Sequence, residues 1–184
     1  MRLFLAVDIP DAIKGKVDEL LVRLKKRLKN VPLRFVETDN LHLTLKFIGE
    51  VSPENAQRIQ NLLKTINYSV LNLSFFGGDT FPYGKKEPQV LYLSLGDETL
   101  ARLVSILELS LKSLGIERDP KAFKGHLTLA RVKGRMVPPQ VQIFRELTED
   151  FTENFVAREF ILYQSCLSLQ GPTYKALERY GLEG

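Results

Sequence analysis

The chain is poor in cysteine and has no long apolar segment, and both absences limit what it can be. Its 184 residues include one cysteine, Cys166, so no intrachain disulfide can form, as in proteins of reducing, intracellular compartments. No stretch reaches the roughly 20 apolar residues of a membrane-spanning helix. The N-terminal apolar run from Leu3 to Val7 ends at Asp8, so we interpret it as a strand rather than a signal peptide. We therefore expect a cytoplasmic protein with no membrane partner.

The overall composition is that of an ordinary globular chain with a mild basic excess. Hydrophobic residues make up 44% and charged residues 26%, enough for one sizeable domain. The net charge of +4 favours anionic partners such as nucleic acid or a nucleotide, but many proteins without such partners are equally basic.

Histidine is also scarce, and its two occurrences are informative. His42 begins the tetrapeptide HLTL, and His126 begins the same tetrapeptide again. At ordinary residue frequencies a given histidine is followed by Leu-Thr-Leu roughly once in 2,000 times, so chance is a poor explanation. The match therefore indicates an internal repeat.

The segments around the two tetrapeptides repeat in the same order: strand, helix, histidine strand, helix, strand. In the first half we expect strands at 2–8, 42–49 and 70–76, with helices starting at Pro10 and Pro53. In the second half we expect strands at 90–95, 126–134 and 155–169, a helix at 97–111 and a helix at 138–147, before a last strand from Tyr174.

The repeat predicts an α+β fold with two pseudo-symmetric lobes. We expect a single bilobed domain over 1–184, with antiparallel strands in each lobe and a central cleft between the lobes. By sequence the lobes are 1–78 and 88–184, and a segment at 77–88, rich in Gly, Pro and charge, connects them.

Strand alternation predicts which side chains face the cleft. His42, Thr44 and Lys46 share one face of the first histidine strand, whereas the leucines and Phe47 point to the core. His126 and Thr128 share the equivalent face of the second strand. Arg131 faces the other way unless a β-bulge or the end of the strand turns it toward the cleft.

Two histidines and two hydroxyls in one cleft suit displacement at phosphorus. One imidazole takes a proton from the nucleophile and the other gives a proton to the leaving oxygen, since both titrate near neutral pH. Thr44 and Thr128 are candidates to hydrogen bond the non-bridging oxygens, with Lys46 and Arg131 as further phosphate-binding candidates.

Two other readings of these residues stay open. The histidines would be metal ligands in a metal-dependent phosphohydrolase, although the chain shows no compact His-x-x-x-His or His-x-Glu pattern. The chain would alternatively be a non-catalytic module that binds RNA or nucleotides. Loss of a histidine or a threonine would signal such a module, and all four are present.

Two His-x-Thr motifs in duplicated halves resemble the two-histidine phosphoesterase superfamily, and within it the RNA 2′,3′-cyclic phosphodiesterases, also called 2′-5′ RNA ligases. The resemblance covers the chain from Arg2 to about Tyr180, through the segments RLFLAVDIP, NLHLTLKFIGEV, FPYGKKEPQVLYLSL, FKGHLTLARV and SCLSLQGPTYKALERY. It implies a bilobed α+β fold with antiparallel sheets facing a groove.

The same resemblance implies an activity and its partners. It implies hydrolysis of RNA 2′,3′-cyclic phosphate ends to 2′-phosphomonoesters without metal or nucleotide cofactor. We separately expect the protein to be a monomer. The resemblance also implies that some members reversibly join RNA halves, such as tRNA halves, through a 2′-5′ linkage. By this resemblance His42 is the proton donor and His126 the proton acceptor, roles that the residue pattern alone leaves open.

The sequence gives the least information about which residues recognise a nucleobase. Phe47, Tyr83, Phe123 and Tyr174 are candidates to stack on a nucleobase. Core packing competes with this role for each of them, and alternation places Phe47 on the core face.

Overall fold

In the computed structural model the first strand, β1 (Arg2–Asp8), lies inside the sheet, and its apolar run from Leu3 to Val7 is buried on both faces. The structure describes residues 1–82, 87–96, 98–168 and 171–183. In chain order its other elements are α1 (Asp11–Arg27), β2 (Leu33–Phe35), a short 3-10 helix (Thr38–Asn40), β3 (His42–Glu50), α2 (Pro53–Leu63), β4 (Leu71–Phe81), β5 (Val90–Gly96), α3 (Glu98–Lys112), β6 (His126–Val132), α4 (Pro138–Thr148), β7 (Asn154–Ala157), β8 (Glu159–Ser168) and β9 (Gly171–Gly181).

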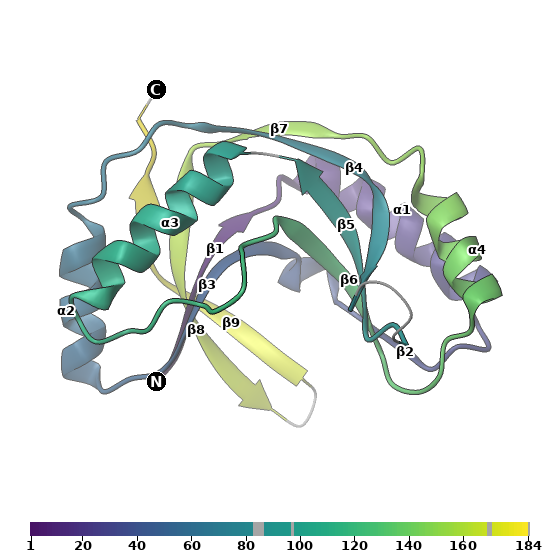
Figure 1. Ribbon diagram of the computed structural model, residues 1–184, viewed down its shortest axis with the longest axis horizontal. Helices are drawn as coiled ribbons and strands as arrows, with labels where there is room; N and C mark the ends of the chain where they lie inside the picture. Colours follow the sequence, from purple (N-terminus) through teal and green to yellow (C-terminus); the bar gives the residue numbers. More distant parts are fainter. Residues whose placement is uncertain (83–86, 97, 169–170, 184) are drawn as a thin grey trace.

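The strands form one curled antiparallel sheet, and the helices lie on its outer side (Figure 1). Along the sheet the order is β7-β4-β5-β6-β3-β1-β8-β9, with β2 added at the end of β6. Every pairing of these strands is antiparallel. The predicted α+β class with antiparallel pairing is thus confirmed.

The four helices of the described residues form where the apolar periodicity predicts them. α1 buries a stripe at helical spacing, made of Ile13, Val17, Leu20, Leu21 and Leu24. α2 begins as expected after Ser52, whose hydroxyl accepts a hydrogen bond from the Asn55 N–H at 3.2 Å. The predicted start of the third helix at Asp97 lies outside the described residues.

The two lobes in space differ from the two halves of the sequence, so the predicted division at 77–88 does not separate them. β4, from the first half, pairs with β5, and β8, from the second half, pairs with β1. The helices also pair across the two halves of the chain: α1 packs against α4, whereas α3 packs against α2 and β3 (Figure 1). Each lobe is therefore built from both halves of the chain.

Two strand predictions need correction. Residues 77–81, assigned to the connection, belong to β4, where Gly77 has φ +60 at a bulge in the pairing with β5. Gly78 brings β4 against α4 so closely that a Cβ would lie 2.5 Å from the Thr148 hydroxyl oxygen. The single strand expected at 155–169 is two strands, since β7 pairs with β4 and β8 pairs with β1.

β3 and β6 carry the two HLTL motifs and meet at the middle of the sheet. They pair only where Leu43 lies opposite Leu127. Beyond this point β6 pairs with β2, from Leu33 opposite Val132 to Phe35 opposite Ala130. The sheet therefore opens between β3 and β6, and the two motifs lie at the base of the opening.

Candidate active site

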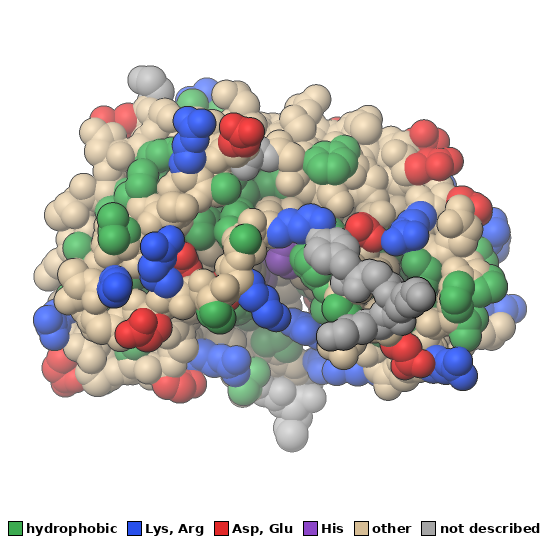
Figure 2. Space-filling view, in the orientation of Figure 1, with side chains coloured by type: hydrophobic (Ala, Val, Ile, Leu, Met, Phe, Trp, Pro, Cys, Tyr) green, Lys and Arg blue, Asp and Glu red, His purple; other side chains and the backbone are tan. Residues whose placement is uncertain are grey.

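Both motifs line a single groove of about 1740 Å³. Among its lining residues are His42 and Thr44 from β3 and His126 and Thr128 from β6. Figure 2 shows the hollow at the centre of this face, with a histidine visible in it and Lys and Arg side chains gathered around it. The structure thus brings the four predicted motif residues together on one surface.

The pairing of β3 with β6 sets how these four residues face one another. With Leu43 opposite Leu127, the antiparallel direction places His42 toward Thr128 and Thr44 toward His126. Both leucines are buried, which keeps the histidines and threonines on the groove face. Each histidine is thereby grouped with the hydroxyl of the other repeat.

Each imidazole is fixed through the same backbone hydrogen bond. His42 Nδ1 lies 2.8 Å from the carbonyl oxygen of Asn40, and His126 Nδ1 lies 2.8 Å from the carbonyl oxygen of Lys124. A carbonyl oxygen only accepts, so Nδ1 carries the proton in both rings. In the neutral ring Nε2 is then an acceptor, and in the charged ring it is a donor, which are the two states that acid-base chemistry needs.

Aromatic side chains surround both rings and shield them from water. The His42 ring centroid lies 5.1 Å from that of Phe4 and 5.1 Å from that of Tyr174. The His126 ring centroid lies 5.1 Å from that of Phe81 and 5.4 Å from that of Tyr92. This burial is the main cause that lowers the pKa of both histidines below 6.5.

The strands that neighbour the histidines make the two sites electrostatically unequal. Asp8 lies opposite His42 in the β1–β3 pair, whereas Ser94 holds the equivalent place opposite His126. The charge of Asp8 partly offsets the lowering of the His42 pKa, while the charges of Lys124 and Arg131 lower the His126 pKa further. The neighbouring charges thus act in opposite directions, since the Asp8 carboxylate favours a proton on His42 whereas Lys124 and Arg131 disfavour one on His126.

Asp8 is itself held in place by two side chains from β8 and β9, the strands that follow β1 in the sheet. Tyr163 donates a hydrogen bond to Asp8 Oδ1 at 2.6 Å, and Arg179 Nη2 lies 3.7 Å from Asp8 Oδ2. Burial and the contact with this carboxylate raise the pKa of Tyr163, so its hydroxyl stays neutral and continues to donate. Sequence reasoning missed Asp8, because only the β1–β3 register places it beside His42.

A β-bulge follows the threonine in each motif and changes two predicted orientations. Ala6 lies opposite Thr44 but Leu5 lies opposite Lys46, so Leu45 is the extra residue and Lys46 points to the core side. Phe47 then returns to the groove face, where it is 65% exposed. The predictions that Lys46 shares the His42 face and that Phe47 points to the core are therefore wrong.

The second motif has the same bulge at the same place. Tyr92 lies opposite Thr128 and Leu91 opposite Ala130, so Leu129 is the extra residue and Arg131 lies on the groove face. This is the bulge that an inward Arg131 requires. Arg131 thus stands at the repeat position of Phe47, and Ala130 at that of Lys46.

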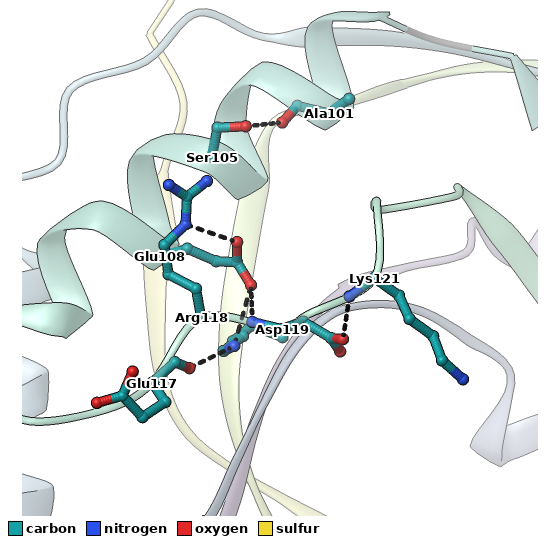
Figure 3. Close-up of polar contacts among 8 residues, drawn as sticks. Ala101, Ser105, Glu108, Glu117, Arg118, Asp119 and Lys121 are labelled. Carbon is teal, nitrogen blue, oxygen red and sulfur yellow. Dashed lines mark hydrogen bonds and ion pairs between the residues drawn. The ribbon is translucent and has the colours of Figure 1, made fainter.

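Lys46 is instead held in a buried ion pair with Glu108, which Figure 3 shows beside Arg118 and Asp119, and both residues of the pair also line the groove. Lys46 Nζ lies 3.0 Å from Glu108 Oε1 and donates a hydrogen bond to the carbonyl oxygen of Glu117 at 2.8 Å. Glu108 also accepts a hydrogen bond from the Asp119 N–H at 2.9 Å. The pair therefore anchors residues 117–119, at the start of the segment that leads to His126.

The remaining predicted aromatic residues have different positions. Tyr174 and Phe123 line the groove with Phe47. Tyr83 lies outside the described residues. Sequence analysis also missed Arg34, a groove residue on the three-residue strand β2, which is too short to show any periodicity.

The described residues contain neither a cluster of metal ligands nor a membrane-spanning helix. Among the described residues, no three His, Cys, Asp or Glu side chains come together as a metal site would require. No helix in the described ranges is long and apolar enough to cross a bilayer.

Comparisons with known proteins place the chain among relatives. The family model described as LigT like Phosphoesterase matches residues 7–92. The chain is 40% identical to an Archaeoglobus fulgidus protein named RNA 2′,3′-cyclic phosphodiesterase, over 96% of this chain and 98% of the relative. A Methanocaldococcus jannaschii protein of the same name is 31% identical over 98% of this chain and 100% of its own length.

Solved structures give the same result for the fold. The crystal structure of E. coli LigT complexed with 3′-AMP matches with a TM-score of 0.75 and 26% identity, over 98% of this chain and 97% of that chain. Sequence and fold therefore agree that this chain belongs to the LigT-like family of two-histidine phosphoesterases.

Proposed function

We propose that this protein hydrolyses RNA 2′,3′-cyclic phosphate ends to 2′-phosphomonoesters by two-histidine acid-base catalysis. The observation that carries the proposal is the matched pair of imidazoles in one groove, each with Nδ1 bonded to a backbone carbonyl and Nε2 left for chemistry. The relatives named RNA 2′,3′-cyclic phosphodiesterase support the choice of substrate.

The proposed step is a displacement at phosphorus with His126 as base and His42 as acid. His126 Nε2 takes a proton from water as the water oxygen bonds to phosphorus. The bond from phosphorus to O3′ breaks, and protonated His42 gives its Nε2 proton to O3′. The products are a 2′-phosphomonoester and a free 3′-hydroxyl, and one proton transfer back through solvent restores the histidines.

The unequal surroundings of the two rings support this division of roles. Asp8, opposite His42, favours the charged imidazole that an acid needs. Lys124 and Arg131 favour the neutral His126 that a base needs. Thr44 and Thr128 are proposed to donate to the non-bridging oxygens, and Arg131 to offset their charge.

The same chemistry supports a second reaction and a range of partners. A 5′-hydroxyl from another RNA in place of water would give a 2′-5′ linkage, which makes ligation of RNA halves the reverse of cleavage at that bond. We propose RNA ends, including tRNA halves, as the partners of a cytoplasmic monomer that works without a metal ion. The single free cysteine, Cys166, is consistent with a reducing compartment.

One incubation tests the function. Adenosine 2′,3′-cyclic phosphate, with and without EDTA, should give 2′-AMP at equal rates, and 31P NMR separates 2′-AMP from 3′-AMP. His42→Ala and His126→Ala should each lower kcat on the order of 10²- to 10⁴-fold, whereas Arg58→Ala, on the outer helix α2, should change nothing.

Each alternative has its own outcome. Activity that EDTA abolishes and zinc restores would point to a metal-dependent phosphohydrolase. Nucleotide binding without turnover would point to a binding module, and either result would overturn the proposal. A 3′-monophosphate product would reverse the assigned leaving oxygen.

A further inference from the structure

Two arginines stand side by side on the wall of the groove. β2 pairs with β6 so that Arg34 lies directly opposite Arg131. Directly opposite residues of an antiparallel pair project from the same face of the sheet, with Cβ atoms roughly 4.5–5.5 Å apart. Both side chains are exposed and both line the groove.

Such a pair is unfavourable unless an anion is present. Like charges directly opposite each other destabilise a sheet. Within the described ranges neither guanidinium forms an ion pair with a carboxylate. Guanidinium groups bind phosphate oxygens through paired N–H donors, so a phosphate between the two would turn the repulsion into attraction.

Gly171, at the start of β9, limits where the Arg34 guanidinium can lie. Its Nη2 lies 2.9 Å from the place that a Cβ on Gly171 would take, at a glycine with φ +133. Any side chain at position 171 would therefore push the guanidinium away. The glycine at the start of β9 leaves room for Arg34 to extend across the groove.

The pair adjoins the site proposed for the reacting phosphate, to which Arg131 also contributes charge, and Arg34 lies on the neighbouring strand β2. On β6 the groove face carries His126, then Thr128, then Arg131 after the bulge. Neighbours on one face of a strand are about 7 Å apart, a distance that one nucleotide of an extended chain can span. Arg131 is near enough to His126 to lower its pKa, whereas Arg34, directly opposite Arg131 on β2, is not among the causes of that shift.

We propose that Arg34 and Arg131 together bind the phosphate on the 5′ side of the terminal nucleotide, so that the enzyme prefers RNA ends to isolated cyclic nucleotides. This inference rests on the proposed function for the identity of the reacting phosphate. Further cations continue the wall in the same direction, since Lys25 and Lys133 also line the groove. Lys25 Nζ lies 5.5 Å from the ring centroid of Phe35, the residue after Arg34.

The test uses two substrates that differ by one phosphate: adenosine 2′,3′-cyclic phosphate and its 5′-phosphorylated form. The wild-type protein should have the higher kcat/KM for the 5′-phosphorylated form. Arg34→Gln should lower kcat/KM for that form about 10-fold, the effect of one lost hydrogen bond to a charged group. Its kcat/KM for the unphosphorylated substrate should fall much less, so the ratio of the two values carries the test. Arg58→Gln is the matched control on α2 and should change neither value.

Equilibrium binding separates this inference from the proposed function, because it needs no turnover. By calorimetry, adenosine 2′,5′-bisphosphate should bind the wild-type protein more tightly than 2′-AMP, and Arg34→Gln should remove the difference. The inference would be overturned if Arg34→Gln lost the same affinity for both ligands. It would also be overturned if the wild-type protein bound adenosine 2′,5′-bisphosphate no more tightly than 2′-AMP. If neither cyclic substrate is hydrolysed, the proposed function fails while the binding result still decides the role of Arg34.

Discussion

Replacing Lys46 with methionine tests whether this lysine is structural, as its buried ion pair with Glu108 indicates. The substitution keeps most of the side-chain length but removes the ammonium group. That group lies 3.0 Å from Glu108 Oε1 and 2.8 Å from the Glu117 carbonyl oxygen. The Lys46 and Glu108 side chains are only 6% and 10% exposed, so the variant leaves a charge in a mostly buried place.

The expected loss in the free energy of unfolding depends on which partners Glu108 keeps in the variant. Removing one partner of a buried ion pair typically costs about 3–5 kcal/mol. Glu108 keeps the Asp119 N–H at 2.9 Å and the half-exposed Arg118 at 3.5 Å, which lowers our expectation to about 2–3 kcal/mol. For a chain of this length that corresponds to a Tm lower by about 4–12 °C.

Urea unfolding at pH 7 and kinetics at 25 °C provide the assay. Lys46→Met should lose stability while kcat per folded molecule stays within about two-fold, because the ammonium group is already bound by Glu108 and the Glu117 carbonyl oxygen. The double variant Lys46→Met/Glu108→Leu should recover part of the loss, since no charge is then left unpaired. Lys64→Met is the matched control: Lys64 pairs with Glu178 at 2.8 Å on the surface, so its loss should cost less than about 1 kcal/mol.

The opposite pattern would refute the reasoning. If Lys46→Met kept its stability and lost kcat on the order of 10²-fold, the lysine would act on phosphate after all. Acid unfolding gives a second readout. The Asp119 N–H and Lys46 outweigh the effect of burial and hold the pKa of Glu108 below 4.5. The stability that this carboxylate contributes is full above that value and is lost as pH falls through and below it, so Lys46→Met should show a weaker acid dependence.

Three further predictions follow from the groove and from the packing behind it. Asp8→Asn should lower the pKa of His42 further and so move the alkaline limb of the kcat/KM profile to lower pH; an unmoved limb would mean that Asp8 does not act on His42. Thr44→Val and Thr128→Val should each lower kcat on the order of 10²- to 10³-fold without loss of Tm, and a wild-type rate would exclude them as phosphate donors. Gly78→Ala should lower stability by about 1–3 kcal/mol in thermal unfolding, because its Cβ would lie 2.5 Å from a buried hydroxyl of α4; an unchanged Tm would show that α4 moves freely.

The sequence predicted the four motif residues because their placement depends only on local alternation. From His42 to Thr44 the strand alternates without interruption, so leucines on one face put the histidine and the hydroxyl on the other. The same holds from His126 to Thr128. Placing both pairs in one groove required only that the two repeats face each other, which the duplication itself suggested.

The errors begin where orientation depends on pairing between strands. The bulges at Leu45 and Leu129 have no residue signal, since they exist only relative to β1 and β5. They moved Lys46 to the core side and brought Phe47 and Arg131 to the groove. The placement of β4 and β8 in lobes built from both halves of the chain likewise depends on pairing between strands far apart in the sequence. The glycines at the start of segment 77–88 resembled the start of a linker.

Duplication creates a difficulty that the rest of the sheet resolves. Two identical HLTL strands give two equivalent imidazoles, yet displacement at phosphorus requires one to be charged and the other neutral. The residues that differ between the repeats lie on neighbouring strands or beyond the bulge: Asp8 against Ser94, and Phe47 against Arg131. The first difference favours a proton on His42, and the cation of the second disfavours one on His126. In the proposed mechanism the repeat supplies both imidazoles, and the departures from the repeat distinguish their roles.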